Sequence, residues 1–187
     1  MIKAILFDMD SNFQIEIAKA EDAGGITEVQ RTTWLATYPN KDAGISYSDV
    51  KEQTDKFNSE RIIQKLSNPD VRYWVAKIHG KIAGMLKVSK GDDKNSLEAL
   101  YVLPEFQGKG IGAALTKIGL EWLGYEKDIT LGVVIYNKSA IDFYKKFGFV
   151  EGGERHDSVA SLPSGKVLPE IEMVLRKKIR NKAKVEI

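Results

Sequence analysis

The segment LYVLPEFQGKGIG, residues 100–112, decides the fold of this 187-residue chain. It begins as an apolar run that Pro104 stops, and it continues as a turn with a glycine at every second position from Gly108 to Gly112. Apolar residues then recur at the spacing of a helix with one buried face: Ile111, Leu115, Ile118 and Trp122. The segment therefore predicts a strand, a glycine-rich turn and a helix in direct succession.

The turn over residues 107–112, the glycine turn, has the properties of a phosphate-binding cradle. Glycine lets the backbone approach a ligand closely, and the start of a helix offers unpaired N–H groups and the positive end of the dipole. The turn is not a dinucleotide-binding motif, because its strand is the third of a meander. It is not a P-loop either, because Ala113 and Ala114 follow the last glycine. By itself the motif also fits an ordinary strand-to-helix turn.

The elements on both sides of the glycine turn predict a mixed fold. Before the turn we expect a strand, two helical regions and an antiparallel meander: 13–18, 22–34, 47–66, 71–78, 82–88 and 96–103. After the helix that follows the glycine turn, we expect strands over 129–135, 149–152 and 171–175 and a helix over 139–147. Asp22 stands where an N-cap of the first helix is expected. This order predicts an α+β sheet with helices on both faces.

The composition excludes several classes of function. The chain has no cysteine, which excludes a thiolate nucleophile, a disulfide framework and cysteine-ligated zinc. His79 and His156 are far apart and lack a metal-ligand pattern, so no metal site is expected. The net charge of +2 does not predict nucleic-acid binding. We expect no membrane span, because no run approaches about 18 apolar residues, and a cytoplasmic location, because no signal peptide is evident.

Two segments resemble the GNAT superfamily of N-acetyltransferases. Gln107, Gly110 and Gly112 fill the family's pattern of Gln or Arg, two residues, Gly, one residue, and Gly or Ala. The stretch LGVVIYNKSAIDFYKKFGF, residues 131–149, resembles the family's strand, Asn, Ala, aromatic–Tyr helix and Gly–Phe ending. The resemblance covers about residues 13–176. It implies a mixed, mostly antiparallel sheet of six to seven strands and acetyl-coenzyme A (acetyl-CoA) as co-substrate.

The resemblance also implies a pose for the co-substrate. The third meander strand should splay from the next strand and expose backbone groups to the pantetheine arm, while the glycine turn holds the pyrophosphate. The residues expected to bind acetyl-CoA are Leu100, Tyr101, Val102, Gln107, Gly108, Lys109, Gly110, Ile111, Gly112, Ala113, Asn137, Ala140, Phe143 and Tyr144. Of these, Asn137 and Tyr144 should lie near the thioester.

Acetyl transfer to an amine requires two proton movements. The amine must lose a proton to attack the thioester, and the leaving thiolate benefits from gaining one. Tyr144, with an ordinary pKa near 10, is the expected general acid, although a packing aromatic is the alternative. Glu98 is the candidate base, with water or a solvated glutamate as alternatives. Simple alternation would put Glu98 on the same face as Leu100 and Val102.

The acceptor is less defined by the sequence. Trp34, Tyr38 and Tyr73 are the expected substrate-binding aromatics, although such residues also build cores. Residues 34–38 resemble polyamine-acetylating members, so we expect a small primary amine such as a polyamine. A protein N-terminal or lysine acetyltransferase and a non-catalytic CoA-binding module remain alternatives. A homodimer is left open.

The N-terminus carries a second resemblance. Residues 2–10 resemble the first motif of haloacid-dehalogenase-type phosphatases, in which Asp8 would be the nucleophile and Asp10 the acid or base. Ser11 and Asn12 stand where that family has Gly–Thr, and its other motifs are not found in a credible order. We therefore expect residues 1–12 to be a leader or fusion remnant, 13–176 an N-acetyltransferase domain, and 177–187 a basic tail.

Overall fold

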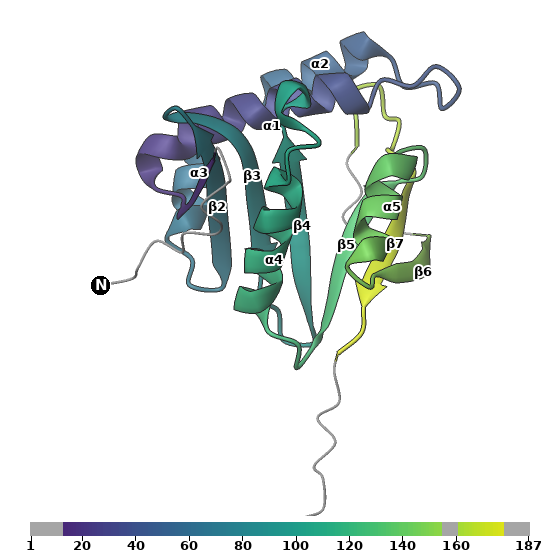
Figure 1. The fold of residues 1–187 in the computed structure, drawn as a ribbon. Coiled ribbons are helices and arrows are strands. Elements are labelled where there is room, and N and C mark those ends of the chain that lie inside the picture. Colours follow the sequence, from purple (N-terminus) through teal and green to yellow (C-terminus); the bar gives the residue numbers. More distant parts are fainter. Residues whose placement is uncertain (1–12, 155–160, 178–187) are drawn as a thin grey trace, which may run out of the picture.

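The fold is a seven-stranded sheet with helices on both faces (Figure 1). The computed structural model describes residues 13–154 and 161–177. The strands run in the spatial order β1-β2-β3-β4-β5-β7-β6. They are β1 (Gln14–Ile17), β2 (Val71–Ile78), β3 (Lys81–Ser89), β4 (Lys94–Val102), β5 (Asp128–Val134), β6 (Val150–Glu154) and β7 (Glu170–Leu175).

Five α-helices and two short 3-10 helices connect these strands within the described ranges. The helices are η1 (Ala20–Asp22), α1 (Ala23–Thr37), α2 (Tyr47–Asp55), α3 (Ser59–Leu66), η2 (Pro104–Phe106), α4 (Ile111–Leu123) and α5 (Lys138–Lys146). In the part of the chain that is described, no helix combines the length and apolar character that crossing a bilayer requires. Residues 2–10, which resemble the phosphatase motif and contain Asp8 and Asp10, lie outside the described residues.

The pairing pattern confirms the predicted α+β sheet. β4 and β5 pair in parallel, and the other neighbouring strands pair antiparallel. The predicted meander is β2-β3-β4, and the predicted helix after the glycine turn is α4. Its apolar stripe is buried as expected at Ile111, Leu115 and Ile118.

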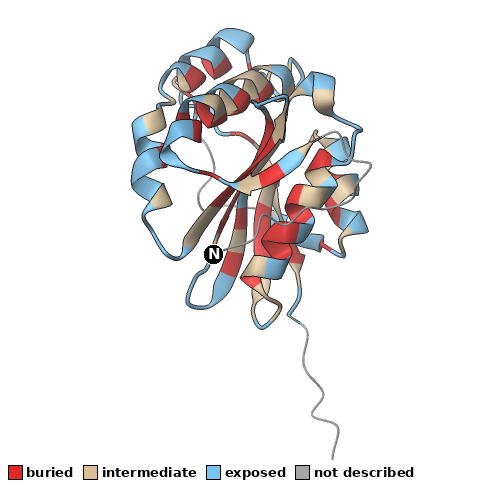
Figure 2. Cartoon of the chain, turned by 60° about the vertical axis from the view of Figure 1, so that its left-hand side comes forward, coloured by how far each residue is buried: buried red, intermediate tan, exposed pale blue. Residues whose placement is uncertain are grey.

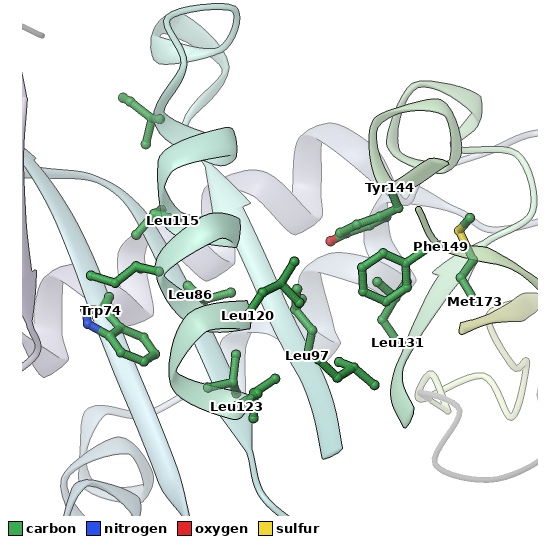
Figure 3. Close-up of a cluster of buried hydrophobic side chains, with 14 of the residues drawn as sticks. Trp74, Leu86, Leu97, Leu115, Leu120, Leu123, Leu131, Tyr144, Phe149 and Met173 are labelled. Atoms are coloured by element: carbon green, nitrogen blue, oxygen red, sulfur yellow. The ribbon is translucent and has the colours of Figure 1, made fainter. Parts of the chain in front are cut away.

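The two faces of the sheet carry separate hydrophobic cores. The core under α4 and α5, here the α4-side core, includes Leu86, Leu115, Leu131, Phe149 and Met173 (Figure 3). The core under α1 and α3, here the α1-side core, includes Ile26, Val29, Val75 and Met85. Figure 2 shows the buried residues gathered in the sheet and on the inner sides of the helices, with the outer sides exposed.

β4 and β5 form a fork. Their parallel pairing spans only Lys94–Ser96 and Asp128–Thr130, and beyond these residues the two strands diverge (Figure 1). At the closed end of the fork, the buried Asn95 donates from Nδ2 to the carbonyl of Leu123 at 3.0 Å. This bond satisfies a carbonyl at the end of α4, where helices leave acceptors unpaired. It thereby attaches the end of α4 to the closed end of the fork.

A bulge in β4 changes the side-chain alternation at Glu98. Val88 of β3 pairs with Leu97. Its neighbour Lys87 pairs with Ala99, so Glu98 is an extra residue between the two pairs. A residue inserted in this way shifts which side chains face each side of the sheet.

The bulge overturns the predicted orientation of Glu98. Leu100 and Val102 pack in the α4-side core, whereas Ala99 packs in the α1-side core. The Glu98 carboxylate forms an ion pair with Lys87, the cross-strand partner of Ala99. Glu98 therefore lies on the side opposite to Leu100 and Val102. The prediction that these three share a face is wrong, because simple alternation does not count the bulge.

The structure corrects two further details near the N-terminal helices. The helical region predicted over 47–66 is two helices, since α2 ends at Asp55 and Asn58 caps α3 by accepting from the Arg61 amide at 3.0 Å. Asp22 does not cap α1 with its side chain. Its carboxylate instead accepts from the backbone amide of Lys19, the N-cap of η1, at 2.8 Å and forms an ion pair with Lys77 of β2.

Two glycine substitutions test how closely α4 packs on the sheet. A Cβ at Gly119 would lie 2.5 Å from Leu86 Cδ2 and 3.2 Å from Val88 Cγ1, so Gly119→Ala should destabilise the fold by about 1–3 kcal/mol through overpacking. A Cβ at Gly24 in α1 would meet no atom within 4 Å. Gly24→Ala should therefore stabilise by about 0.5–1 kcal/mol. Urea denaturation measures both, and the same sign for the two variants would contradict the packing.

Candidate active site

A cavity of about 460 Å³ occupies the open end of the fork. Its walls come from β4, β5, the start of α4, α5, the end of α1 and the first residue of β7. Most of the residues predicted to bind acetyl-CoA meet here: Leu100, Tyr101, Val102, Gln107, Gly108, Gly110, Ile111, Gly112, Ala113, Asn137, Ala140, Phe143 and Tyr144. The fold therefore brings the glycine turn and the predicted general acid to one space.

The glycine turn leaves room for a ligand at the start of α4. Gly108 and Gly110 have φ angles of 75° and 81°, in the left-handed region that favours glycine. A Cβ at either position would meet no atom within 4 Å. Gly110 is the N-cap of α4 and offers no side chain to the first N–H groups of that helix. These donors, the helix dipole and the open space fit a pyrophosphate group.

The strand edge next to the glycine turn suits an extended ligand arm. Because β5 pairs with β4 only as far as Ser96, the later residues of β4 border the cavity instead of a neighbouring strand. Gln107 fixes the end of this edge by donating from Nε2 to the carbonyl of Val102 at 3.0 Å. The strand backbone can thus offer N–H and C=O groups to an amide-containing chain such as pantetheine.

Tyr144 reaches the cavity from α5. Its side chain is only 8% exposed, and its hydroxyl points from α5 toward the side of α4 and β4 (Figure 3). Burial, with a smaller contribution from nearby Tyr101, raises the pKa of Tyr144 well above its ordinary value. The phenol therefore stays protonated across the pH range in which amines begin to lose their protons.

Asn137 has a structural task at the beginning of α5. Its Oδ1 accepts hydrogen bonds from the amide of Ala140 at 3.2 Å and from the hydroxyl of Ser139 at 2.9 Å. The side-chain oxygen therefore caps the helix. The amide nitrogen of Asn137 is the group that it can offer to a ligand in the cavity.

Three tyrosines, Tyr38, Tyr101 and Tyr136, form a hydrogen-bonded group that we call the tyrosine cluster. The Tyr101 hydroxyl accepts from Trp34 Nε1 at 2.8 Å and also from Tyr38. The Tyr136 hydroxyl donates to the backbone carbonyl of Tyr38 at 2.8 Å. Desolvation is the largest cause that raises the pKa of each of the three, and the Glu170 carboxylate adds to it.

Glu98 borders the cavity as part of an ion pair. Burial acts to raise its pKa, but hydrogen bonds from Lys87 and Ser89 and the ammonium groups of Lys87 and Lys65 outweigh this effect. The net pKa of Glu98 lies below its ordinary value. A carboxylate held in this way is a weak proton acceptor.

Three predicted residues lie outside the cavity wall. Lys109 places its Nζ 5.0 Å from the centre of the Phe106 ring and does not line the cavity. Tyr73 is 3% exposed and belongs to the α1-side core, so its aromatic ring serves packing. Trp34 supports the wall from behind through its hydrogen bond to Tyr101, whereas Tyr38 itself lines the cavity.

Sequence reasoning missed several wall residues, of which Thr33, Thr37 and Glu170 matter most. Glu170 immediately precedes the strand predicted over 171–175, so the sequence does place a carboxylate at a strand end. Its approach to the cavity depends on β7 lying between β5 and β6, which local patterns do not reveal.

The comparisons with known proteins agree with this geometry. The model of the acetyltransferase (GNAT) family matches residues 29–149, which include both the glycine turn and α5. The chain belongs to the GNAT family of acetyltransferases. Its activity is acetyl-CoA-dependent N-acetyl transfer, and acetyl-CoA is its co-substrate.

Individual relatives are distant. The chain is 25% identical over 138 residues to a protein named as an uncharacterized N-acetyltransferase of Lactobacillus delbrueckii subsp. lactis, covering 67% of this chain and 78% of that one. It is 33% identical over 93 residues to a putative ribosomal protein bS18-alanine N-acetyltransferase of Bacillus subtilis, covering 48% and 61%. The crystal structure of PaiA N-acetyltransferase from Thermoplasma acidophilum with coenzyme A superimposes with a TM-score of 0.68 at 21% identity, covering 89% and 99%. At this level of identity, the similarity to the Thermoplasma acidophilum structure shows a shared fold.

A charge placed at Gly110 tests the cradle. Gly110→Asp should abolish the rise in melting temperature that coenzyme A causes, because a carboxylate would face the pyrophosphate. Gly110→Asn is the matched control: asparagine is similar in size, tolerates a positive φ and is neutral. We expect it to keep most of the rise. Equal losses in the two variants would show that charge at this position is not the cause.

Proposed function

We propose that the chain acetylates a small primary amine by direct attack on acetyl-CoA, with Tyr144 as general acid. The main support is that Tyr144, whose hydroxyl points toward α4 and β4 (Figure 3), lines the same cavity as the glycine turn. A cavity of about 460 Å³ is in the size range of small-molecule sites. The end of α1 and the first residue of β7 contribute to its wall, which favours a small acceptor.

The transfer can be written with every proton assigned. A neutral amine nitrogen attacks the thioester carbonyl carbon, the C–N bond forms, and the carbon–sulfur bond then breaks. The nitrogen loses one proton and the sulfur gains one. Tyr144 donates its phenol proton toward the sulfur as the bond breaks and recovers a proton from solvent. Backbone N–H groups along β4 beyond Ser96 are the candidate donors to the developing oxyanion.

We propose water as the acceptor of the amine proton. Glu98 is unsuited to this task because its ion pair with Lys87 lowers its basicity and fixes the carboxylate on the α1 side. The role of Glu98 is then to neutralise the buried Lys87 beside the cavity. A buried ammonium without a partner would otherwise be costly.

Transfer to a protein N-terminus is the second candidate function. The similarity to the Bacillus subtilis protein named as a ribosomal protein bS18-alanine N-acetyltransferase favours it. A turnover screen with small amines, lysine peptides and alanine-starting peptides separates the candidates. Turnover of peptides alone would overturn the small-amine proposal, and no turnover of any acceptor despite acetyl-CoA binding would favour a non-catalytic module.

Replacement of one hydroxyl tests the role of Tyr144. Tyr144→Phe keeps the ring and its packing but removes the proton, so kcat should fall at least ten-fold, because general acid catalysis is typically worth about 10²–10⁴-fold. The affinity for acetyl-CoA should change little, because the contact matters as the thioester breaks. Tyr47→Phe, at an exposed site on α2, is the matched control and should have no effect. Full kcat in Tyr144→Phe would make this residue a packing aromatic.

The pH dependence follows from the raised pKa of Tyr144. For a monoamine acceptor, kcat/KM should rise with pH as the amine loses its proton. At pH values up to about 10, the ordinary pKa of tyrosine, kcat/KM should show no decrease, because burial keeps the Tyr144 phenol protonated to higher pH. Steady-state kinetics from pH 6 to about pH 10 measure the profile. A falling limb near pH 8–9 that disappears in Tyr144→Phe would contradict the assignment.

A further inference from the structure

We propose that the Tyr101 hydroxyl is a fixed hydrogen-bond donor on the acceptor side of the cavity and that it binds an oxygen atom of the acceptor. The preferred acceptors are then primary amines that carry a carbonyl, ether or hydroxyl oxygen close to the reacting nitrogen. This inference rests on the proposed transfer to a small amine. It gives the side chain of Tyr101 a task separate from the contact expected between its backbone and acetyl-CoA.

The hydrogen bonds of Tyr101 leave only its proton for a ligand. Its oxygen accepts from Trp34 Nε1 at 2.8 Å and from the Tyr38 hydroxyl. An indole N–H can only donate, which fixes the direction of the first bond. A hydroxyl has one proton and two lone pairs, so the accepting positions of Tyr101 are filled. Within residues 13–154 and 161–177, no group accepts the Tyr101 proton.

The proton stays on Tyr101. Desolvation raises the pKa of this phenol, and this effect outweighs the hydrogen bonds from Tyr38 and Trp34, which act in the opposite direction. The Glu170 carboxylate raises the pKa further through its charge, without a hydrogen bond to the phenol. The hydroxyl is therefore a neutral donor under the conditions in which amines are acetylated.

The surroundings of Tyr101 hold its hydroxyl in place. Tyr101 lies on β4, where it pairs with Met85 of β3. Its partner Trp34 makes edge-to-face contacts with Tyr38 and Phe57, with ring centres 4.6 and 5.1 Å apart. The hydroxyl is thus fixed between a central strand and a packed helix, and groups on regular elements are positioned more precisely than groups on loops.

Tyr101 reaches the cavity from the side left to the acceptor. Its side chain packs against the α1-side core, whereas Tyr144 belongs to the α4-side core, and both residues line the cavity. Burial raises the pKa of Tyr144, and Tyr101 adds to this rise, so the two side chains approach each other across the fork. The glycine turn places acetyl-CoA beside α4. The acceptor then lies between the thioester and Tyr101.

The free proton decides which atom of the acceptor Tyr101 can bind. An ammonium group has only donors and cannot bond a hydroxyl whose accepting positions are filled. The lone pair of the reacting nitrogen is needed for attack on the thioester. An oxygen near that nitrogen has lone pairs to spare. It also withdraws electrons and lowers the pKa of the amine, which increases the neutral fraction when water takes the amine proton.

Two amines of equal length test this contact. Only 2-methoxyethylamine has an ether oxygen, which accepts and cannot donate, whereas butylamine has a methylene group in its place. The oxygen preference is the ratio of kcat/KM for the ether amine to that for butylamine. Tyr101→Phe should lower this ratio at least about five-fold relative to wild type, because the ether oxygen loses its donor. The difference in basicity between the amines is the same for every variant and cancels.

Tyr136→Phe is the matched control. It removes a hydroxyl of the same tyrosine cluster, but that hydroxyl donates to the Tyr38 carbonyl, and Tyr136 lies outside the cavity wall. It should preserve the oxygen preference. An equal loss for both amines in Tyr101→Phe would assign the hydroxyl to the acetyl group or to folding, and an unchanged ratio would show no contact. Either result overturns the proposal.

Binding separates a failure of this contact from a failure of the proposed function. If wild type acetylates neither amine, the proposed function fails. In that case 2-methoxyethylamine should still raise the melting temperature of the coenzyme A complex of wild type, and raise it less in Tyr101→Phe. No rise in wild type, or equal rises in the two proteins, would reject the contact.

Discussion

The short parallel pairing of β4 and β5 is the constraint on which the rest of the site depends. Hydrogen bonding between these strands ends at Ser96 and Thr130, so the sheet opens where a continuous sheet would leave no space. The α4-side core holds the two halves together, because it contains residues from α4 and β3 as well as from α5, β5 and β7 (Figure 3). Asn95 attaches α4 to the closed end of the fork. The glycine turn and Tyr144 then face the same space from opposite halves of the sheet.

The bulge at Glu98 decides the electrostatics of that space. It turns the only carboxylate of β4 toward Lys87, and the ion pair makes this carboxylate a poor base. The remaining carboxylate of the described wall, Glu170, lies among hydroxyl groups whose pKa values are raised by desolvation. Phenols that stay protonated can donate hydrogen bonds without adding charge.

Much of this arrangement could be predicted from local sequence. The strand, glycine turn and helix over 100–123 follow from short-range patterns, and the motif at 131–149 is sufficient to place Asn137 and Tyr144 at the cavity. The face of the sheet on which the Glu98 side chain lies could not be predicted, because a bulge depends on the pairing register between two strands. Tyr73 has the same aromatic character as Tyr38, and only the packing of the first helices assigns one to the core and the other to the cavity. Glu170 depended on the strand order β5-β7-β6.

All the roles proposed for the site require acetyl-CoA to lie in the fork, along β4 and across the glycine turn. Amide hydrogen exchange with and without acetyl-CoA tests this most directly, since a bound ligand protects the backbone groups that it contacts and the elements that it holds closed. We expect slower exchange in residues 97–102 and 108–113 when the ligand is bound, with little change in β1 and β2. Tight binding of acetyl-CoA with unchanged exchange in both of these segments would contradict it.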